Sequence, residues 1–147
     1  MDDNYTKSNS IELIPKLKIS QITKQFYYQF REQTIISVKD LQHLTNNICM
    51  DLGINDIAVT FTGTQPHKHN GKRLQRKTLG IHRQHKGINI YRFTAVRKKQ
   101  VSPKTAIDTL LHEIMHRIDY VIIELTKSIH SKGFYSRLKH LTETIKE

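Results

Sequence analysis

A long helical pattern occupies the segment from residue 102 to about residue 125, and any fold of this chain must accommodate it. Ser102 followed by Pro103 is typical of a helix start, because serine accepts a hydrogen bond from the first turn and proline already has the backbone angle of that turn. Apolar residues then recur at the spacing of one helix face. These residues are Ala106, Leu110, Ile114, Val121 and Leu125.

Shorter patterns elsewhere predict further helices and a small sheet. Ser37 and Asp40 resemble a capping box, and the apolar stripe behind them ends at Gly53, a residue type that favours a helix end. Helical spacing recurs in two other segments, and β-branched or aromatic runs predict about three strands. We expect helices over 20–33, 37–52 and 131–145 and strands over 57–61, 78–82 and 88–93.

The order of these elements, helices followed by a small sheet and then two more helices, predicts an α+β fold. Residues 1–19 are polar and irregular, with Pro15 among them, and we interpret them as a tail or an extended arm. Residues 20–147 then form a single domain, which is the number of domains that a chain of 147 residues favours.

The single cysteine of the chain, Cys49, excludes an internal disulfide and every zinc ribbon built from several cysteines. The first residues lack the basic start and apolar run of a signal peptide. No uncharged apolar run approaches the ~20 residues that a membrane span needs. We therefore expect a soluble protein that is cytoplasmic, or nucleoid-associated, and has no membrane partner.

The net charge of +11, from 24 Lys and Arg against 13 Asp and Glu, is concentrated in the middle of the chain. Residues 57–107 contain no acidic residue but half of the Lys and Arg. This segment is a candidate surface for DNA, where Phe61, Tyr91 and Phe93 would stack on exposed bases; the alternative is a solvated loop surface. The candidate nucleic-acid-binding residues are Lys72, Arg73, Arg76, Lys77, Arg83, Arg97, Lys98 and Lys99.

The motif His112-Glu113-Ile-Met-His116 falls in the middle of the long helical pattern. Residues four apart lie one turn apart on the same face of a helix, so both imidazoles can reach one metal ion. Glu113 is offset around the helix and can stand beside an open coordination position, where a general base acts. The alternative is a helix whose His and Glu side chains face solvent or pair with each other.

A catalytic zinc site needs a third protein ligand and an open position for water. His130 is favoured, because the thirteen residues that separate it from His116 allow the chain to turn and return beside the first two ligands. Glu143, late in the last helix, is the alternative. Glu124 is too far along the same helix unless that helix breaks, and His140 lies outside the apolar stripe of the last helix.

The segments TLLHEIMHRIDY and HSKGFYSRL together resemble the SprT-like metalloprotease domain, the type found in bacterial SprT and eukaryotic Spartan. In that family an HExxH helix is followed by a third zinc-binding histidine and a short segment with Gly-Phe-like residues. The segment LGIHRQHKGINIY is similar to the family's sheet edge that precedes the active-site helix. The residues that match the family pattern are His112, His116 and His130 for the metal, Glu113 for catalysis, and Gly133-Phe134 after the third histidine.

This resemblance covers roughly residues 37–141 and implies a small zincin-like domain with Zn²⁺ as cofactor. It implies a zinc metalloprotease that hydrolyses peptide bonds in a protein or peptide substrate, including DNA-associated proteins. The four-cysteine ribbon that SprT-like proteins often carry cannot form here. Two alternatives remain. One is a nucleic-acid-binding protein with a structural or vestigial zinc site. The other is a repressor-cleaving ImmA-like peptidase, which resembles the class of zincins whose third metal ligand is a glutamate.

Other side chains near the motif are candidates for supporting roles. Tyr120, Tyr135 and Arg137 could each stabilise the oxyanion of peptide hydrolysis, and their spacing does not choose among them. Asp119, three residues after His116, is a candidate acceptor for the second ring nitrogen of a ligand histidine.

Overall fold

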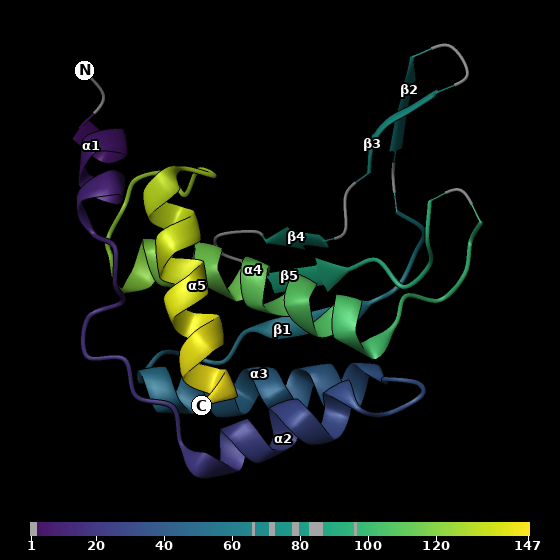
Figure 1. The fold of residues 1–147 in the computed structure, drawn as a ribbon, viewed down its shortest axis with the longest axis horizontal. Helices are drawn as coiled ribbons and strands as arrows, with labels where there is room; N and C mark the ends of the chain where they lie inside the picture. Colours follow the sequence, from purple (N-terminus) through teal and green to yellow (C-terminus); the bar gives the residue numbers. More distant parts are fainter. Residues whose placement is uncertain (1–2, 66, 71–72, 78–79, 83–86, 96) are drawn as a thin grey trace.

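The computed structural model describes residues 3–65, 67–70, 73–77, 80–82, 87–95 and 97–147, and these form a mixed α+β structure, as predicted (Figure 1). None of the described helices is long and apolar enough to cross a membrane. The helices are α1 (Asp3–Ser10), α2 (Gln21–Arg31), α3 (Val38–Leu52), α4 (Pro103–Val121) and α5 (Lys132–Lys146). The strands are β1 (Ala58–Phe61), β2 (His67–Asn70), β3 (Arg73–Lys77), β4 (Gly80–His82) and β5 (Gly87–Ile90).

Three of the strands form one sheet in the order β1-β5-β4 (Figure 1). β1 and β5 run parallel, with Val59 opposite Ile88, and β4 pairs antiparallel with β5. Ile88 and Ile90 are buried and alternate with half-buried residues, as expected for a strand with one face on the core. β4 is an edge strand of this sheet.

β2 and β3 form a separate antiparallel hairpin, which projects from the rest of the molecule in Figure 1. The sequence predicts no strand between residues 61 and 78, so this hairpin is missed. Among the residues of its two strands only Leu74 is apolar. A strand leaves an alternating sequence pattern when one of its faces is buried, and these strands have no such pattern.

The predicted starts of α3 and α4 are confirmed. Ser37 Oγ accepts a hydrogen bond from Asp40 N at 3.1 Å, and Asp40 Oδ2 accepts one from Ser37 N at 3.1 Å, which completes a capping box at α3. α3 ends at Gly53, whose φ of 69° is left-handed and suits glycine. At α4, Ser102 Oγ accepts from Thr105 N at 3.2 Å.

The predicted end of the long helix is wrong, because α4 ends at Val121 and not at Leu125. Glu124 has a left-handed φ of 62°, and the backbone N–H of Leu125 donates to the backbone oxygen of Asp119 at 2.9 Å. This turn returns Ile123 and Leu125 to the core, where they are 4% and 5% exposed. The apolar spacing of Leu125 therefore reflects burial after a turn and not a continued helix.

The interpretation of residues 1–19 as a tail or extended arm is wrong for residues 3–10, which form α1. The polar sequence of α1 has no apolar stripe that could reveal a helix. Farther along, Ile14 is 2% exposed, and its backbone N–H donates to Nδ1 of His140 at 2.9 Å. The segment around Ile14 therefore contacts α5, which lies more than a hundred residues later in the sequence.

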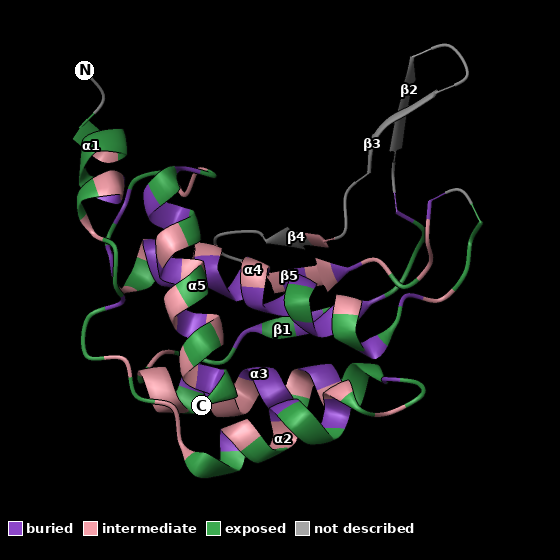
Figure 2. Cartoon of the chain, in the orientation of Figure 1, coloured by how far each residue is buried: buried purple, intermediate pink, exposed green. Residues whose placement is uncertain are grey.

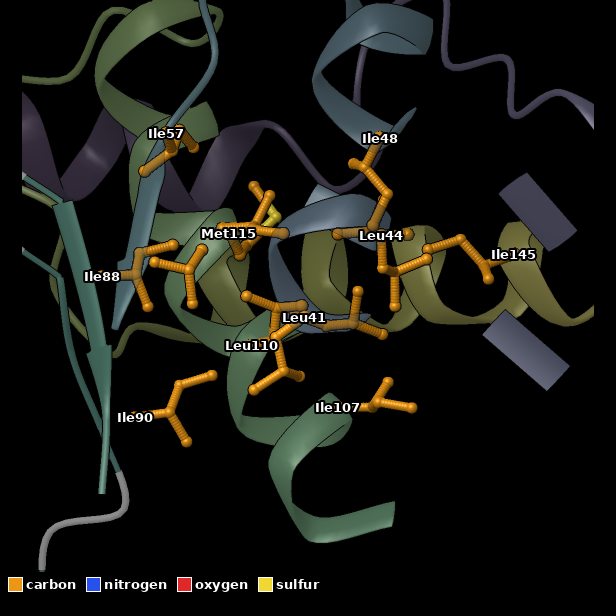
Figure 3. Packing of buried hydrophobic residues seen from close by; sticks show 14 of the residues in the cluster. Leu41, Leu44, Ile48, Ile57, Ile88, Ile90, Ile107, Leu110, Met115 and Ile145 are labelled. Carbon is orange, nitrogen blue, oxygen red and sulfur yellow. The ribbon is translucent and has the colours of Figure 1, made fainter. Parts of the chain in front are cut away.

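α4 is the centre of the hydrophobic core. It packs against α2, α3 and α5 and against strands β4 and β5, and Figure 2 shows buried residues recurring along its length. Figure 3 shows Leu110 and Met115 of α4 among side chains of α3 and of the sheet. The site described next is therefore built on the most enclosed helix of the fold. The other residues labelled in Figure 3 are Leu41, Leu44, Ile48, Ile57, Ile88, Ile90, Ile107 and Ile145.

We predict that Leu110→Ala lowers the free energy of unfolding by about 2–5 kcal/mol, because it leaves a cavity in a fully enclosed part of the core. Leu110 is 0% exposed. Urea unfolding followed by circular dichroism measures the change. Met50→Ala on α3 is the control, since Met50 is 76% exposed, and it should change the free energy by less than about 0.5 kcal/mol. Equal losses in the two variants would contradict the central position of α4.

Candidate metal centre

Three histidines from two parts of the chain converge on one point. His112 and His116 lie one turn apart on α4, and His130 lies at the end of the loop between α4 and α5. Nε2 of His130 is 3.0 Å from Nε2 of His112 and 3.1 Å from Nε2 of His116. His112 and His116 are half-buried, whereas His130 is exposed. The three rings therefore present one nitrogen each to a common point that solvent can reach.

The spacing of these nitrogens fits a single metal ion. Two imidazole nitrogens at ~2.05 Å from a tetrahedral Zn²⁺ lie about 3.3 Å apart, close to the separations observed here. Among the described residues, His112, His116 and His130 are the group of side chains close enough to hold an ion. Three protein ligands leave one tetrahedral position open for water or substrate, as in catalytic zinc sites.

The alternative third ligands lie elsewhere. Glu143 is exposed and is 3.9 Å from Lys139 on the same helix. His140 accepts a hydrogen bond from Ile14 through Nδ1. Glu124 stands in the turn after α4, where its backbone oxygen accepts from Lys7 Nζ at 3.4 Å. Of the predicted candidates, the structure brings His130 to the first two histidines and leaves these three outside the group.

The ring of Phe134 contacts all three histidine rings. It is 0% exposed, and its ring stacks on His116 at 4.5 Å between centroids with an angle of 26°. Its ring also meets His112 at 5.1 Å and His130 at 5.3 Å in edge-on contacts. The residue is placed by the first turn of α5, where Ser131 Oγ accepts from Phe134 N at 3.1 Å. Packing against one buried ring limits the rotation of the imidazoles.

His116 is oriented by a hydrogen-bonded chain that begins at Asp119. Ser128 Oγ donates to Oδ2 of Asp119 at 2.6 Å, which uses its one hydrogen. Ser128 must then accept from Nδ1 of His116, which lies 2.7 Å away. This contact fixes the proton of His116 on Nδ1 and leaves the lone pair of Nε2 directed at the other two histidines. Asp119 thus acts on His116 through Ser128, a residue that follows no sequence pattern and that the sequence analysis misses.

Asp119 is paired in turn with Arg137, and both side chains are 0% exposed. Nε of Arg137 donates to Oδ1 of Asp119 at 3.0 Å. The guanidinium is therefore committed to a buried ion pair and not to a substrate. Tyr120 has a structural contact as well, because its hydroxyl oxygen accepts from Ser128 N at 3.1 Å. Of the three candidates for oxyanion stabilisation, only Tyr135 has a half-exposed ring beside the histidines, at 6.4 Å from His112 and 6.0 Å from His130.

Glu113 lies beside the edge strand of the sheet. It is 6% exposed, and its Cγ is 3.5 Å from the position that a side-chain carbon would occupy on Gly80 of β4. The same added carbon would be 2.7 Å from Cγ2 of Thr109 and too close to it. Glycine at position 80 therefore allows β4 to lie directly against α4 next to Glu113.

The local electrostatics favour neutral nitrogen ligands. Burial lowers the pKa of His112, and the neighbouring His130 lowers it further. The neutral imidazole is the form that binds a metal ion. Cys49 lies in the core, where burial raises the pKa of its thiol to about 11, so it remains a packing residue.

The candidate nucleic-acid-binding residues fall on separate segments. Arg73, Arg76 and Lys77 belong to β3, and Arg97, Lys98 and Lys99 are exposed in the loop before α4. Lys72 and Arg83 lie outside the described residues. Phe61 is 3% exposed, so its expected role in base stacking is wrong: it faces the core from β1. Tyr91 and Phe93 are half-buried.

No protein-family model, curated protein or solved structure matches this chain. The most specific chemistry in the described part is the converging histidine group, with Glu113 next to His112 on α4.

We predict that His130→Ala weakens metal binding by more than about 100-fold, beyond the effect of losing an outer partner, because one of three ligands is lost. Competition with a chromophoric chelator measures the affinity for Zn²⁺. Glu143→Ala is the control and should bind as the unmodified chain does. The reverse result, a loss in Glu143→Ala alone, would show that the third ligand is the carboxylate.

Ser128→Ala should weaken metal binding by about 10–100-fold, because the Nδ1 proton of His116 loses its acceptor and the imidazole ring is no longer held in its orientation. The same chelator competition measures the loss. Ser136→Ala on α5 is the matched control. Unchanged affinity in Ser128→Ala would contradict the role of the Asp119–Ser128–His116 chain.

Proposed function

We propose that this protein is a zinc-dependent peptidase of the SprT-like type, with a zincin-like domain. In this proposal His112, His116 and His130 hold Zn²⁺, and Glu113 is the general base. The observation that carries the proposal is that Nε2 of His130 lies 3.0 Å from Nε2 of His112 and 3.1 Å from Nε2 of His116, two histidines of the helix that also carries Glu113. Three imidazoles with an open fourth position are typical of catalytic zinc and not of closed structural sites.

The chemistry of peptide hydrolysis fits these side chains. Bound Zn²⁺ would polarise the scissile carbonyl and make a water molecule acidic near neutral pH. The Glu113 carboxylate would accept a proton from that water as the oxygen adds to the carbonyl carbon. It would then deliver the proton to the amide nitrogen, so that the C–N bond breaks and the amine leaves neutral. The low exposure of Glu113 favours this role, because bulk water then does not compete with the catalytic water for its carboxylate.

An extended polypeptide is the substrate that the surroundings favour. In the described part of the sheet, β4 pairs only with β5, so its outer edge presents backbone donors and acceptors beside Glu113. An extended peptide can add to such an edge through main-chain hydrogen bonds. Tyr135, whose half-exposed ring lies near His112 and His130, is the residue we assign to oxyanion stabilisation.

Two further observations bear on the competing functions. The grouping of His130, and not Glu143, with the HExxH histidines supports the SprT-like assignment over an ImmA-like one. The acid-free segment 57–107 and the exposed Arg97, Lys98 and Lys99 favour substrates that are bound to DNA. A nucleic-acid-binding protein with a vestigial metal site would share that charge but would not need Glu113.

We predict that Glu113→Gln abolishes cleavage of an unfolded test protein while zinc content stays unchanged. A general base contributes about 10²–10⁴-fold to the rate, and glutamine cannot accept the proton. The measurement is cleavage by the zinc-loaded full chain, with and without added DNA, together with metal analysis of each sample.

Glu143→Gln provides the matched control for this experiment, because it makes the same chemical change at an exposed residue of α5. It should cleave at the rate of the unmodified chain. Full activity in Glu113→Gln would refute the assigned role, and absence of cleavage by the zinc-loaded unmodified chain would refute the proposed activity.

A further inference from the structure

The loop between α4 and α5 carries two parts of the candidate metal centre and is held in place by hydrogen bonds. Ser128 and His130 belong to the stretch 126–130, and no residue of this stretch is buried. Burial of apolar surface cannot hold such a stretch in place, so its position depends on hydrogen bonds. Ser128 is held by Asp119 and Tyr120 of α4, and α1 provides further hydrogen bonds.

Asn4 of α1 provides the contacts at one end of the stretch. Its Oδ1 accepts from the backbone N–H of Thr126 at 2.9 Å and of Lys127 at 3.2 Å. Its Nδ2 donates to the backbone oxygen of Lys127 at 2.8 Å. One amide side chain, more than a hundred residues away in sequence, thus satisfies three backbone groups directly before Ser128.

Ser8 of α1 joins the same helix to the buried ion pair. Arg137 donates from Nη1 to the backbone oxygen of Ser8 at 2.6 Å and from Nη2 to its Oγ at 3.0 Å. Ser8 Oγ is also 2.8 Å from Oγ of Ser131, the residue after His130. Ser8 thus accepts two hydrogen bonds from the buried guanidinium that pairs with Asp119, and the backbone oxygen of Ile11 accepts a third at 2.7 Å.

Gly133 allows α1 to approach α5 closely enough for these contacts. A Cβ added at position 133 would overlap the backbone oxygen of Ser8. The backbone N–H of Gly133 donates to Oδ1 of Asn9 at 2.8 Å. Since Gly133 is helical, alanine suits its own backbone, and the collision with α1 is what the substitution would introduce.

We propose that α1 is a part of the metal centre: its docking, through the positioning residues Asn4 and Ser8, sets the affinity of the histidine group for its ion. The inference rests on metal binding by His112, His116 and His130, and not on peptidase activity. A docked α1 holds Ser128 and His130 in the binding arrangement before the ion arrives. If α1 is undocked, Ser128 and His130 must be ordered when the ion binds, and the entropy cost of that ordering lowers the metal affinity.

The coupling is reciprocal. If docking of α1 strengthens metal binding, metal binding strengthens docking of α1 by the same factor. The N-terminal segment and the ion therefore report on each other, although no side chain of α1 is a member of the histidine group.

The test compares point variants of the full chain. Asn4→Ala removes the contacts to Thr126 and Lys127, and Gly133→Ala separates α1 from α5 without altering a ligand. Asn47→Ala is the matched control, because Asn47 donates to His43 within α3. We expect Asn4→Ala and Gly133→Ala to bind Zn²⁺ about tenfold more weakly in chelator competition, the lower end of the effect of outer partners. Asn47→Ala should bind as the unmodified chain does.

Four further tests separate positioning from loss of folding. Circular dichroism of the metal-free variants establishes that each is folded at the temperature of the titration. The visible absorption of bound Co²⁺ should change in Asn4→Ala and Gly133→Ala but not in Asn47→Ala. Asn4→Asp, which keeps the acceptor for Thr126 and Lys127, should bind more tightly than Asn4→Ala. Hydrogen exchange of residues 3–10 should slow when Zn²⁺ is added to the unmodified chain.

The outcomes distinguish the two proposals. Unchanged affinity and an unchanged Co²⁺ spectrum in both Asn4→Ala and Gly133→Ala would overturn the role of α1 and leave the metal centre intact. Failure of the unmodified chain to bind Zn²⁺ or Co²⁺ would overturn the metal centre and, with it, the role of α1.

Discussion

The buried ion pair between Arg137 and Asp119 is the contact on which the arrangement of the metal centre depends. Both side chains are fully enclosed, with Nε 3.0 Å from Oδ1. A buried charge that loses its partner destabilises a protein by about 3–5 kcal/mol, so each group must be satisfied on every side. The second carboxylate oxygen accepts from Ser128, and the other guanidinium nitrogens donate to Ser8 and Ile11. The requirements of one ion pair thereby join α4, α5, α1 and the loop that carries His130.

This arrangement divides the metal centre into a rigid part and a dependent part. His112 and His116 are fixed by α4, which is held on several sides by the core, and by their contacts with Phe134. His130 also contacts Phe134, but it belongs to a loop in which residues 126–130 are not buried. Ser128 also joins Asp119 to Nδ1 of His116, an arrangement that would leave Nε2 of that ring available to a metal ion. The ion pair with Arg137 holds the Asp119 carboxylate in place.

Features that depend on periodic spacing or on hydrogen bonds between residues close in sequence could be predicted. Features that depend on contacts between polar residues far apart in sequence could not. His112, Glu113 and His116 follow from spacing within one helix, and the caps at Ser37 and Ser102 follow from local hydrogen bonds. His130 was favoured because the chain between it and His116 is long enough to turn and return beside the first two histidines. By contrast, Asn4 and Ser128 are ordinary polar residues, and only the fold brings each to its partner. Leu125 and Phe61 were misjudged for a related reason: an apolar residue near a motif signals burial without saying which element buries it.

For the proposed peptidase, the position of the histidine group at the surface suits a large substrate better than a structural ion. A structural zinc site is closed by four protein ligands, whereas the group here has three, and His130 is exposed. Two features near these residues are ones that a polypeptide can use. β4 lies beside Glu113, and the half-exposed ring of Tyr135 lies near His112 and His130. An extended chain can reach such a site from outside without entering a pocket, and its main chain can pair with β4 while a carbonyl approaches the metal. Rigidity from the core and access from solvent are both needed for hydrolysis of a protein substrate, and α4 meets both conditions because one of its faces is in the core and the other carries the histidines.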